Sequence, residues 1–399
     1  MQRQASRSRD NTHRRKSRIM RTQDITWAGD AGIRPDGPAL ADADLVLYFG
    51  NRTALAGTGW FADLHRLYPR AIIAGCSSGG QIADCDVNDD QLVGVAVRFE
   101  STRLRSAEVM IAEVGCSRTC GNEIGSALKA EGLAGILVLS DGLGVNGSEL
   151  VAGISDILGQ NIPICGGLAG DGSDFITTLV GLNGPPTAGR IAAIGFYGTA
   201  ISIGHGSCGG WDVFGPSRAI TRSDANVLIE LDGQPALDLY ERYLGPDDIN
   251  GLPGTALLYP LLIRNPACTG QDLVRTVLSI DRKARTMTFA GDMPRGWTAQ
   301  LMRSSFENLA AGAATAARMA VKPDAPGNGL ALLISCIGRR LMLGQRTVDE
   351  IEAACESLPA SMTKLGFYSY GEISPHSITG CCELHNQTMT VMTLSERAA

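Results

Sequence analysis

The sequence lacks any long apolar run. No window approaches about 18 consecutive apolar residues, and residues 1–22 contain no apolar stretch of the kind found in signal peptides. These absences predict a cytoplasmic protein without a membrane-spanning segment. The sequence also contains no Gly-Lys pair, which excludes a P-loop, and no C-x-x-C spacing among its 11 cysteines. The cysteines are therefore predicted to be buried thiols rather than a disulfide framework.

Positive charge is scarce outside the N-terminus. Residues 1–22 hold eight of the 35 Lys and Arg residues and one of the 41 acidic residues, so the remaining chain carries a net charge of −13. An acidic chain of this kind gives no electrostatic reason to expect nucleic acid binding. Residues 1–22 themselves show no apolar periodicity and are predicted to be a disordered basic tail.

Length and periodicity predict a mixed α/β protein of two packed domains. A chain of 399 residues exceeds the size at which one hydrophobic core stops growing, and 44% hydrophobic with 19% charged residues is ordinary for a globular protein. A helix is predicted over residues 59–69. Apolar runs that are typical of strands occupy residues 44–50, 71–78, 94–100 and 106–114.

Two later segments share one order of elements. Residues 135–183 are predicted as a strand, a helix and two further strands, and residues 329–394 repeat that order with similar spacing. We therefore expect two related strand-helix-strand-strand units that superpose as a pseudo-twofold pair. Between them, the sequence predicts a β-hairpin over 272–291 and one long helix over 299–320.

Residues 204–245 join two unlike pieces. Residues 204–211 are rich in glycine, and we expect a loop that lets a flat or bulky ligand approach the backbone. Residues 227–231 alternate as a half-buried strand, and a turn and a short amphipathic helix follow. This segment is predicted to be the junction of the two domains, with a ligand site near it.

Three runs in the sequence resemble the FIST family, a domain found in bacterial sensory proteins and in some F-box proteins. The runs are ELDGQPALDLYERYLG (230–245), SYGEISP (369–375) and LHNQTMTV (384–391), in the family's order. The resemblance extends over about residues 40–394. It implies a FIST N-like sensory domain over 40–232 and a FIST C-like domain over 233–394, with a role in ligand sensing or interaction.

His205 is the candidate ligand for a haem iron. A neutral imidazole can bind haem iron, and the flanking Gly204 and Gly206 would let a planar macrocycle approach. Arg218 and Arg222 could bind the propionates. The apolar walls would come from Phe196, Tyr197, Ile201, Ile203, Trp211 and Phe214. From the residues alone, His205 could instead be a hydrogen-bonded histidine in a loop. Arg218 and Arg222 could instead lie on a solvated strand face. The resemblance favours haem, because some stand-alone FIST proteins resemble haem-based nitric oxide sensors.

No set of residues predicts catalysis. Ser77 stands in a G-x-S-x-G string after an apolar strand, but the polar run that follows is not the helix that a nucleophile elbow needs. A tight glycine turn that faces a ligand is the alternative for Ser77. Tyr370 and Glu372, from the SYGEISP run, are further ligand-binding candidates, and Glu372 could instead form buried hydrogen bonds.

Two other groups of polar residues have structural interpretations. Asp141, Asp171 and Asp174 lie in glycine-rich turns at strand ends, where side-chain capping of the turn explains them. Four possible metal ligands lie within ten residues, but they do not have a standard zinc spacing. They are His376, Cys381, Cys382 and His385. A turn that carries cysteines is the alternative to a metal site.

The sequence therefore predicts a cytoplasmic small-ligand sensor in signal transduction, without catalytic activity of its own. The resemblance implies that its output passes through a partner, either a histidine kinase or a cyclic-di-GMP enzyme. Three hypotheses remain distinct: a haem-based nitric oxide sensor, a sensor that binds an amino acid or similar metabolite without haem, and a protein-interaction scaffold.

Overall fold

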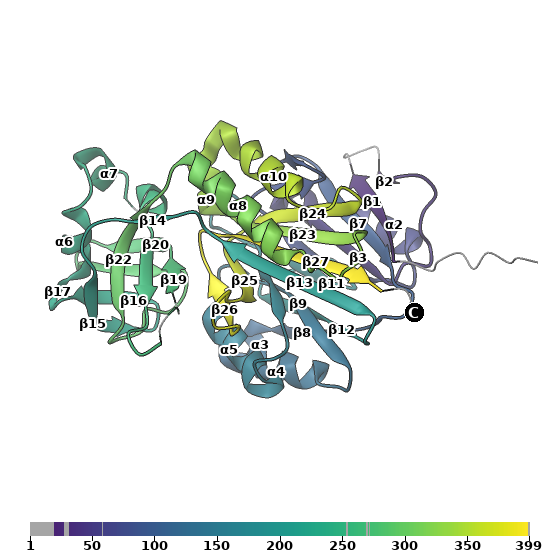
Figure 1. Ribbon diagram of the computed structural model, residues 1–399, viewed down its shortest axis with the longest axis horizontal. Helices are drawn as coiled ribbons and strands as arrows, with labels where there is room; N and C mark the ends of the chain where they lie inside the picture. Colours follow the sequence, from purple (N-terminus) through teal and green to yellow (C-terminus); the bar gives the residue numbers. More distant parts are fainter. Residues whose placement is uncertain are drawn as a thin grey trace, which may run out of the picture.

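The computed structural model describes residues 20–27, 32–57, 59–252, 254–268, 270 and 272–397. Residues 1–19 of the predicted tail lie outside the described residues, and Arg21 and Thr22 begin a strand. The fold is mixed α/β, as predicted. It consists of a large main body and a smaller lobe of residues 212–303, which we name the β-lobe (Figure 1).

Three six-stranded sheets build the main body. Their strands are β1 (Arg21–Trp27), β2 (Ile33–Pro35), β3 (Leu45–Gly50), β4 (Ile72–Ser77), β5 (Gln81–Ala83), β6 (Asp86–Asn88), β7 (Leu92–Arg98), β8 (Arg103–Met110), β9 (Leu133–Ser140), β10 (Ile164–Leu168), β11 (Val180–Leu182), β12 (Arg190–Tyr197), β13 (Ile201–Cys208), β23 (Gly329–Cys336), β24 (Met362–Ser369), β25 (Gly371–Pro375), β26 (Cys382–His385) and β27 (Met389–Glu396). Sheet 1 has the order β11-β4-β3-β7-β1-β2, sheet 2 the order β26-β25-β10-β9-β12-β8, and sheet 3 the order β13-β27-β23-β24-β5-β6.

The helices connect these strands or belong to the β-lobe. They are α1 (Arg52–Ala56), α2 (Trp60–Leu67), α3 (Ile111–Val114), α4 (Ser117–Leu128), α5 (Gly147–Leu158), α6 (Ala236–Glu241), α7 (Pro246–Asn250), α8 (Phe306–Ala320), α9 (Ile337–Leu343) and α10 (Thr347–Glu356), with 3-10 segments η2 (Gly254–Leu258) and η3 (Gly344–Arg346).

Each sheet of the main body contains the same four-stranded unit. A first strand (β3, β9 or β23) runs parallel to the strand that follows it after a helix (β4, β10 or β24). On its other side it pairs antiparallel with β7, β12 or β27. That strand in turn pairs with one from earlier in the chain, β1, β8 or β13. The main body is therefore built from three related units.

The two predicted units are the second and third of these three. They share the predicted order of strand, helix and parallel strand. The third strand predicted in the first of them is β11, but β11 pairs with β4 in sheet 1. Strand β12 occupies the equivalent position in sheet 2, so the expected pseudo-twofold pair is corrected to a threefold repeat that includes residues 44–98.

The three units exchange strands in a cycle. After its second parallel strand, each unit sends the next strand to a neighbouring sheet: β5 pairs with β24, β11 pairs with β4, and β25 pairs with β10. Backbone hydrogen bonds join the crossing segments in the same cyclic order, from Gly79 N to Tyr368 O, from Gly170 N to Ser77 O and from Tyr370 N to Leu168 O. The carboxyl ends of β4, β10 and β24 therefore meet at one point.

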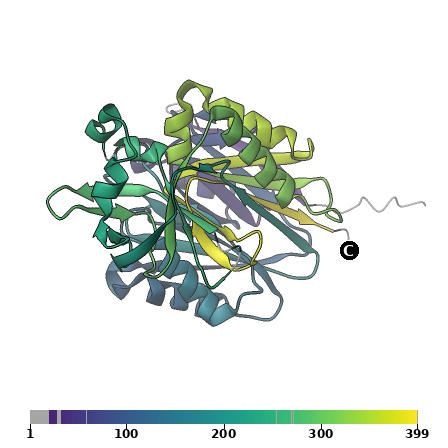
Figure 2. The same cartoon turned by 60° about the vertical axis from the view of Figure 1, so that its left-hand side comes forward.

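One hydrophobic core fills the space between the three sheets. It contains buried residues of β3, β4 and β7, of β9, β10 and β12, and of β23, β24 and β27. Helices cover the outer faces, with α2 on sheet 1, α4 and α5 on sheet 2, and α8 and α10 on sheet 3 (Figures 1 and 2).

The β-lobe has its own sheet and its own core. Its strands are β14 (Asp212–Val213), β15 (Arg218–Asp224), β16 (Val227–Leu231), β17 (Gln234–Pro235), β18 (Leu261–Arg264), β19 (Asp272–Arg275), β20 (Val277–Asp281), β21 (Thr286–Phe289) and β22 (Thr298–Arg303). All buried residues of its hydrophobic cluster belong to the lobe itself. The predicted strand, turn and helix of residues 227–244 are present as β16, β17 and α6, but they lie inside the lobe.

Polar contacts and two chain connections join the β-lobe to the main body. Asn146 Nδ2 donates to Asp292 Oδ1 at 2.8 Å, and Arg275 Nη1 donates to Leu384 O at 3.0 Å. The chain enters the lobe through residues 209–211 and returns through Ser304 and Ser305. Separate cores with polar contacts between them are typical of domains that can move relative to each other.

The long helix predicted over 299–320 is wrong in its first third. Residues 298–303 form β22, because they pair with β18 in the lobe sheet. The helix begins after Ser305, whose side chain accepts a hydrogen bond from Asn308 N as an N-terminal cap. Helix α8 therefore covers Phe306–Ala320 only.

Candidate ligand-binding site

A polar cavity of about 500 Å³ opens where the three units meet. It lies beyond the carboxyl ends of β3, β4 and β23, which is where open α/β sheets bind ligands. Its walls are formed by Asn51, Arg52, Thr53, Ser78, Gly79, Gly80, Gln81, Asp89, Asp171, Gly172, Ser173, Asp174, Ile337, Arg340, Leu341, Gly344 and Thr347.

Two arginines bring positive charge into this cavity. Arg52 Nη2 lies 3.0 Å from Asp174 Oδ2, and Arg340 Nη2 lies 2.7 Å from Asp89 Oδ2. The aspartate side chains are 51% and 60% exposed, so they lie at the rim. Ion pairs with such exposed partners stabilise a protein by only about 0–1 kcal/mol. A ligand carboxylate can therefore compete for either arginine.

Asp171 shapes the wall between the cavity and the neighbouring loop. Its buried carboxylate accepts hydrogen bonds from the backbone N–H groups of Phe175, Ile176 and Thr177 and from the Tyr370 hydroxyl. Burial raises the pKa of Asp171, but these hydrogen bonds outweigh burial and bring the pKa below its usual value. The prediction that Asp171 caps a turn is confirmed.

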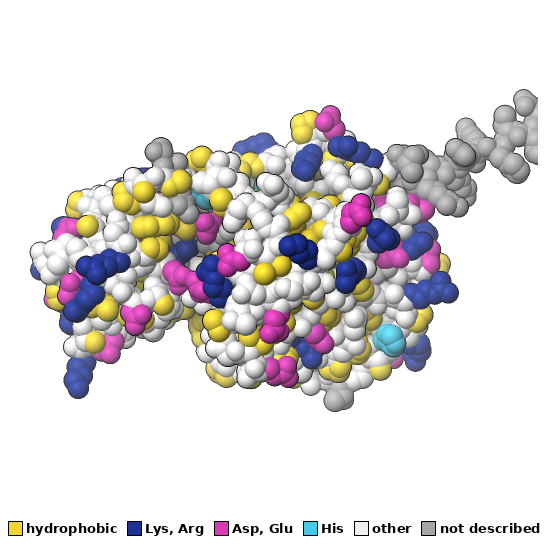
Figure 3. Space-filling model, turned by 90° about the horizontal axis from the view of Figure 1, so that it is seen from below, with side chains coloured by type: hydrophobic (Ala, Val, Ile, Leu, Met, Phe, Trp, Pro, Cys, Tyr) yellow, Lys and Arg dark blue, Asp and Glu magenta, His cyan; other side chains and the backbone are white. Residues whose placement is uncertain are grey.

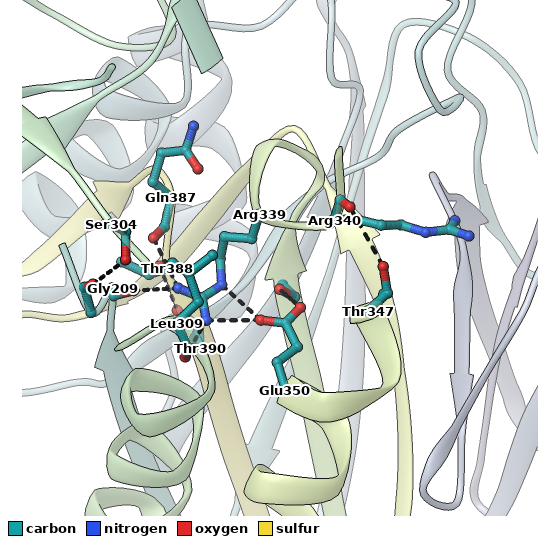
Figure 4. Close-up of polar contacts among 12 residues, drawn as sticks. Gly209, Ser304, Leu309, Arg339, Arg340, Thr347, Glu350, Gln387, Thr388 and Thr390 are labelled. Carbon is teal, nitrogen blue, oxygen red and sulfur yellow. Dashed lines mark hydrogen bonds and ion pairs between the residues drawn. The ribbon is translucent and has the colours of Figure 1, made fainter. Parts of the chain in front are cut away.

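A buried ion pair lies directly behind the cavity. Arg339, the neighbour of Arg340 on α9, places Nη2 at 2.8 Å from Glu350 Oε2, and both side chains are fully buried. Arg339 also donates to the carbonyl oxygens of Gly209 and Leu309 (Figure 4). Gly209 lies where the chain enters the β-lobe, and Leu309 follows the segment that leaves it. Helix α9 therefore contacts both the cavity and the lobe connections.

The three predicted ligand-binding residues lie in different places. Ser77 is buried at the end of β4, where its Oγ accepts a hydrogen bond from Leu179 N at 2.9 Å, and its neighbour Ser78 lines the polar cavity. Tyr370 lines a second cavity of about 320 Å³ between the main body and the β-lobe. Glu372 lines neither of these two cavities.

Glu372 forms buried hydrogen bonds, which the sequence analysis gave as the alternative to ligand binding. Its Oε1 accepts from Ser369 Oγ at 2.6 Å, and its Oε2 accepts from Thr388 N at 3.2 Å and Thr388 Oγ1 at 3.0 Å. Burial raises the pKa of Glu372 to about 8, although these donors favour the ionised form. This carboxyl group therefore titrates near neutral pH inside the core.

The residues around His205 do not form a pocket that fits haem. Residues 201–208 are the regular strand β13 rather than a loop. A Cβ added at Gly204 would lie 1.9 Å from Ala320 O, and one at Gly206 would lie 2.2 Å from Ala316 O, so α8 occupies the space beside both glycines. His205 is half-buried, and burial followed by the charge of Lys322 lowers its pKa.

Trp211 and the two arginines predicted for haem already have protein partners. Trp211 Nε1 donates to Gln387 O at 2.8 Å. Arg218 pairs with Asp232 at 3.0 Å and donates to Tyr243 Oη at 2.7 Å, and Arg222 pairs with Glu230 at 3.1 Å. Both arginines belong to the β-lobe, whereas His205 belongs to sheet 3. The structure does not bring these side chains together, and haem binding stays a prediction.

The four possible metal ligands of residues 376–385 serve as hydrogen-bonding and packing groups. His376 Nδ1 accepts from Ile378 N at 3.3 Å, and His385 Nε2 lies 3.1 Å from Ser374 O. Cys382 Sγ accepts from Ile164 N at 3.3 Å. Among the described residues, no group of three or more His, Cys, Asp or Glu side chains is arranged to bind a metal ion.

The surface charges, the helices and the segment after Ser77 bear on three further predictions. On the face in Figure 3, basic and acidic side chains are interspersed, without a patch of one sign. In the described part of the chain, no helix has the length and apolar character to cross a membrane. The segment after Ser77 leads into strand β5 instead of a helix, so the G-x-S-x-G string is not a nucleophile elbow.

The two cavity arginines were missed by the sequence analysis. Arg52 and Arg340 stand shortly after the apolar runs 44–50 and 329–338, which were recognised as strands. Polar residues that directly follow parallel strands are the available signal, because such strand ends face ligands in α/β folds. The cyclic strand exchange, which brings these ends together, has no local signature in the sequence.

Comparison with known families agrees with this architecture. The family model of the FIST N domain matches residues 44–234, and that of the FIST C domain matches residues 236–375. The two matches cover most of the chain, and the protein belongs to the FIST family, whose domains are associated with signal transduction and small-ligand sensing. No curated protein matches the chain. The boundary between the two matches lies inside the β-lobe, beside β17.

Proposed function

We propose that this protein is a small-ligand sensor that binds an amino acid or a similar zwitterionic metabolite in the polar cavity. The observation that carries the proposal is the pair Arg52 and Arg340, which face one cavity together with carboxylates at its rim. All three units contribute to the cavity, through Ser78, Asp171 and Arg340. A ligand there contacts every unit of the main body at once.

The charges of the cavity favour a ligand that carries both signs. Two arginines face three aspartates, Asp89, Asp171 and Asp174, so a simple anion such as phosphate would meet more negative groups than positive ones. A ligand carboxylate can replace a rim aspartate on Arg52 or Arg340, since charge-assisted bonds to a planar guanidinium are strong and directional. The released Asp89 or Asp174 can then accept from a ligand ammonium group.

Helix α9 offers a route from this site to the β-lobe. Arg340 contacts the cavity, and the adjacent Arg339 donates to Gly209 and Leu309 at the lobe connections (Figure 4). A ligand that moves Arg340 would therefore alter the contacts that fix the lobe. Sensing is then a shift between two populations of lobe position, which a partner protein distinguishes. As the resemblance implies, that partner would be a histidine kinase or a cyclic-di-GMP enzyme.

Thermal-shift screening of the purified chain tests this proposal. The panel contains the standard amino acids, with matching amines and carboxylic acids that lack one of the two charges. We expect at least one amino acid to raise the unfolding midpoint, because a ligand at a hundred times its Kd adds about 2.7 kcal/mol of stability. The single-charge analogues should give smaller shifts.

Three variants locate the binding. Arg340→Gln and Arg52→Gln should each cut the shift to about half or less, because a tenfold loss of affinity leaves the ligand at only about ten times its Kd. Arg66→Gln, which removes a charge from an exposed position on α2, should keep the full shift. A panel without any positive compound would refute the metabolite-sensor proposal and leave the interaction-scaffold hypothesis. A shift that neither cavity variant reduces would place the ligand elsewhere.

A further inference from the structure

A second cavity separates the main body from the β-lobe. It holds about 320 Å³, at the lower end of the range of about 300–1,000 Å³ that is usual for small-molecule pockets. One wall is the loop 142–147 between β9 and α5, and the opposite wall is the lobe. The lining residues are Gly142, Leu143, Gly144, Val145, Asn146, Gly147, Leu168, Phe175, Asn226, Leu278, Phe289, Ala290, Gly291, Tyr370 and Leu384.

The chemistry of this cavity is opposite to that of the polar cavity. Its lining contains no Asp, Glu, Lys, Arg or His, and the two cavities share no lining residue. Three large apolar side chains at its edge are exposed, namely Leu143 (43%), Phe175 (40%) and Leu278 (43%). Leu143 and Phe175 belong to the main body and Leu278 to the lobe. Exposed apolar groups that converge on one cleft mark binding sites.

The ring of Phe175 is fixed in place despite its exposure. It stacks on Tyr370 with ring centroids 4.5 Å apart and an interplanar angle of 13°. Its φ angle is 52°, which is uncommon for a bulky residue, and the Asp171 carboxylate fixes this conformation through the backbone N–H groups of residues 175–177. A strained backbone that presents an exposed aromatic ring is typical of a functional position.

The polar groups around the cavity are already hydrogen-bonded. Asp141 Oδ1 accepts from the N–H groups of Leu143 and Gly144, and Asn146 Oδ1 caps helix α5. Asn226 Nδ2 donates to Phe289 O at 2.9 Å on the lobe side. The wall is therefore preorganised, and most of what it offers a ligand is apolar and aromatic surface.

We infer that this cleft is a second binding site, which takes a neutral small molecule with an aromatic ring. The ring packs against Phe175 and Leu143 on the main body and against Leu278 on the lobe. Such a ligand bridges the two bodies and favours the docked lobe. The inference does not rest on the metabolite proposal, because it concerns different residues and a different ligand class.

Titration of the full chain with N-phenyl-1-naphthylamine, a neutral aromatic dye that fluoresces in apolar surroundings, tests the inference. We expect saturable binding with one site. Phe175→Gly should weaken it by roughly tenfold, since it removes one aromatic wall. Its unfolding midpoint should change little, because the positive φ that glycine accepts offsets the lost stacking on Tyr370. Leu278→Asn should weaken binding from the lobe side.

Two matched controls make the outcome decisive. Ile176→Asn changes a neighbouring side chain that is 64% exposed and does not line the cavity, so it should bind the dye like the parent. Arg66→Gln, at an exposed position on α2 that lines neither cavity, should also bind it unchanged. Absence of saturable binding, or binding that neither Phe175→Gly nor Leu278→Asn weakens, would overturn the inference, whatever the amino acid screen shows.

Discussion

Replacement of the buried Glu372 by glutamine should change how stability depends on pH. In the folded chain the pKa of Glu372 is raised from its ordinary value of 4.5 to about 8, chiefly by burial. The folded state therefore binds a proton that the unfolded state releases above about pH 4.5. The contribution of this proton to the free energy of unfolding is fully present below about pH 4.5 and is lost as the pH rises toward 8.

The size of this effect follows from the shift. A rise in the pKa of Glu372 from 4.5 to 8 corresponds to a change of at most about 5 kcal/mol in the free energy of unfolding, because each pKa unit is worth about 1.4 kcal/mol. The Glu372→Gln variant cannot ionise, so it should avoid most of this loss and be more stable than the parent by about 4 kcal/mol near pH 9. Near pH 5, where both side chains are neutral in the folded state, the two proteins should differ by only about 1 kcal/mol or less.

Denaturant unfolding of parent and variant, from about pH 6.5 to about pH 9, measures the difference. This range avoids His385, whose pKa is lowered to about 4 by burial and whose contribution is lost as the pH falls from 6.5 toward 4. We expect the parent to lose stability across the range relative to the variant. Parallel curves for the two proteins would refute a buried, titrating Glu372.

Three further substitutions test the packing, the lobe connections and the haem hypothesis. Gly206→Ala would place a Cβ 2.2 Å from Ala316 O, so we expect a loss of about 1–3 kcal/mol in thermal unfolding, and an unchanged midpoint would contradict the close contact of α8. Arg339→Met leaves the Glu350 charge buried without its partner, which should lower the free energy of unfolding by about 3–5 kcal/mol. It should also speed proteolysis near Gly209, because the hydrogen bond to Gly209 O is lost. If the variant resists the protease as well as the parent does, α9 is not a link to the lobe. The haem hypothesis predicts a stoichiometric Soret band that His205→Ala loses; because α8 fills the space beside Gly204 and Gly206, we expect no such band, and its appearance would support the haem-sensor hypothesis.

Local patterns in the sequence predicted many of the elements. The helix 148–158 and the strand 227–231 lie where apolar periodicity placed them, because each buries one face against a neighbour close in the chain. The hairpin predicted over 272–291 is present as β20 and β21, residues 277–289, whereas residues 272–275 form β19 and pair with β18. Strand β13 was missed, because glycines predict a loop and only the distant helix α8 explains why Gly204 and Gly206 suit a strand.

The sites depend on contacts that no local pattern contains. The polar cavity exists because the strand exchange brings Ser78, Asp171 and Arg340 together from three units. Tyr370, which stands in a run shared with the FIST family, lines the second cavity, and its role in ligand binding stays a prediction. The haem assignment for His205 assumed that neighbours in sequence, such as Arg218, would also be neighbours in space. The β-lobe separates them.

Isothermal titration of the full chain with the amino acid that gives the largest thermal shift tests the central claim most directly. We predict one binding site, and we predict that Arg340→Gln weakens the affinity by roughly tenfold or more, because a charge-assisted hydrogen bond is worth about 1.5–3 kcal/mol. Arg66→Gln should bind like the parent. Equal affinity of the parent and Arg340→Gln would contradict the assignment of the polar cavity as the sensory site.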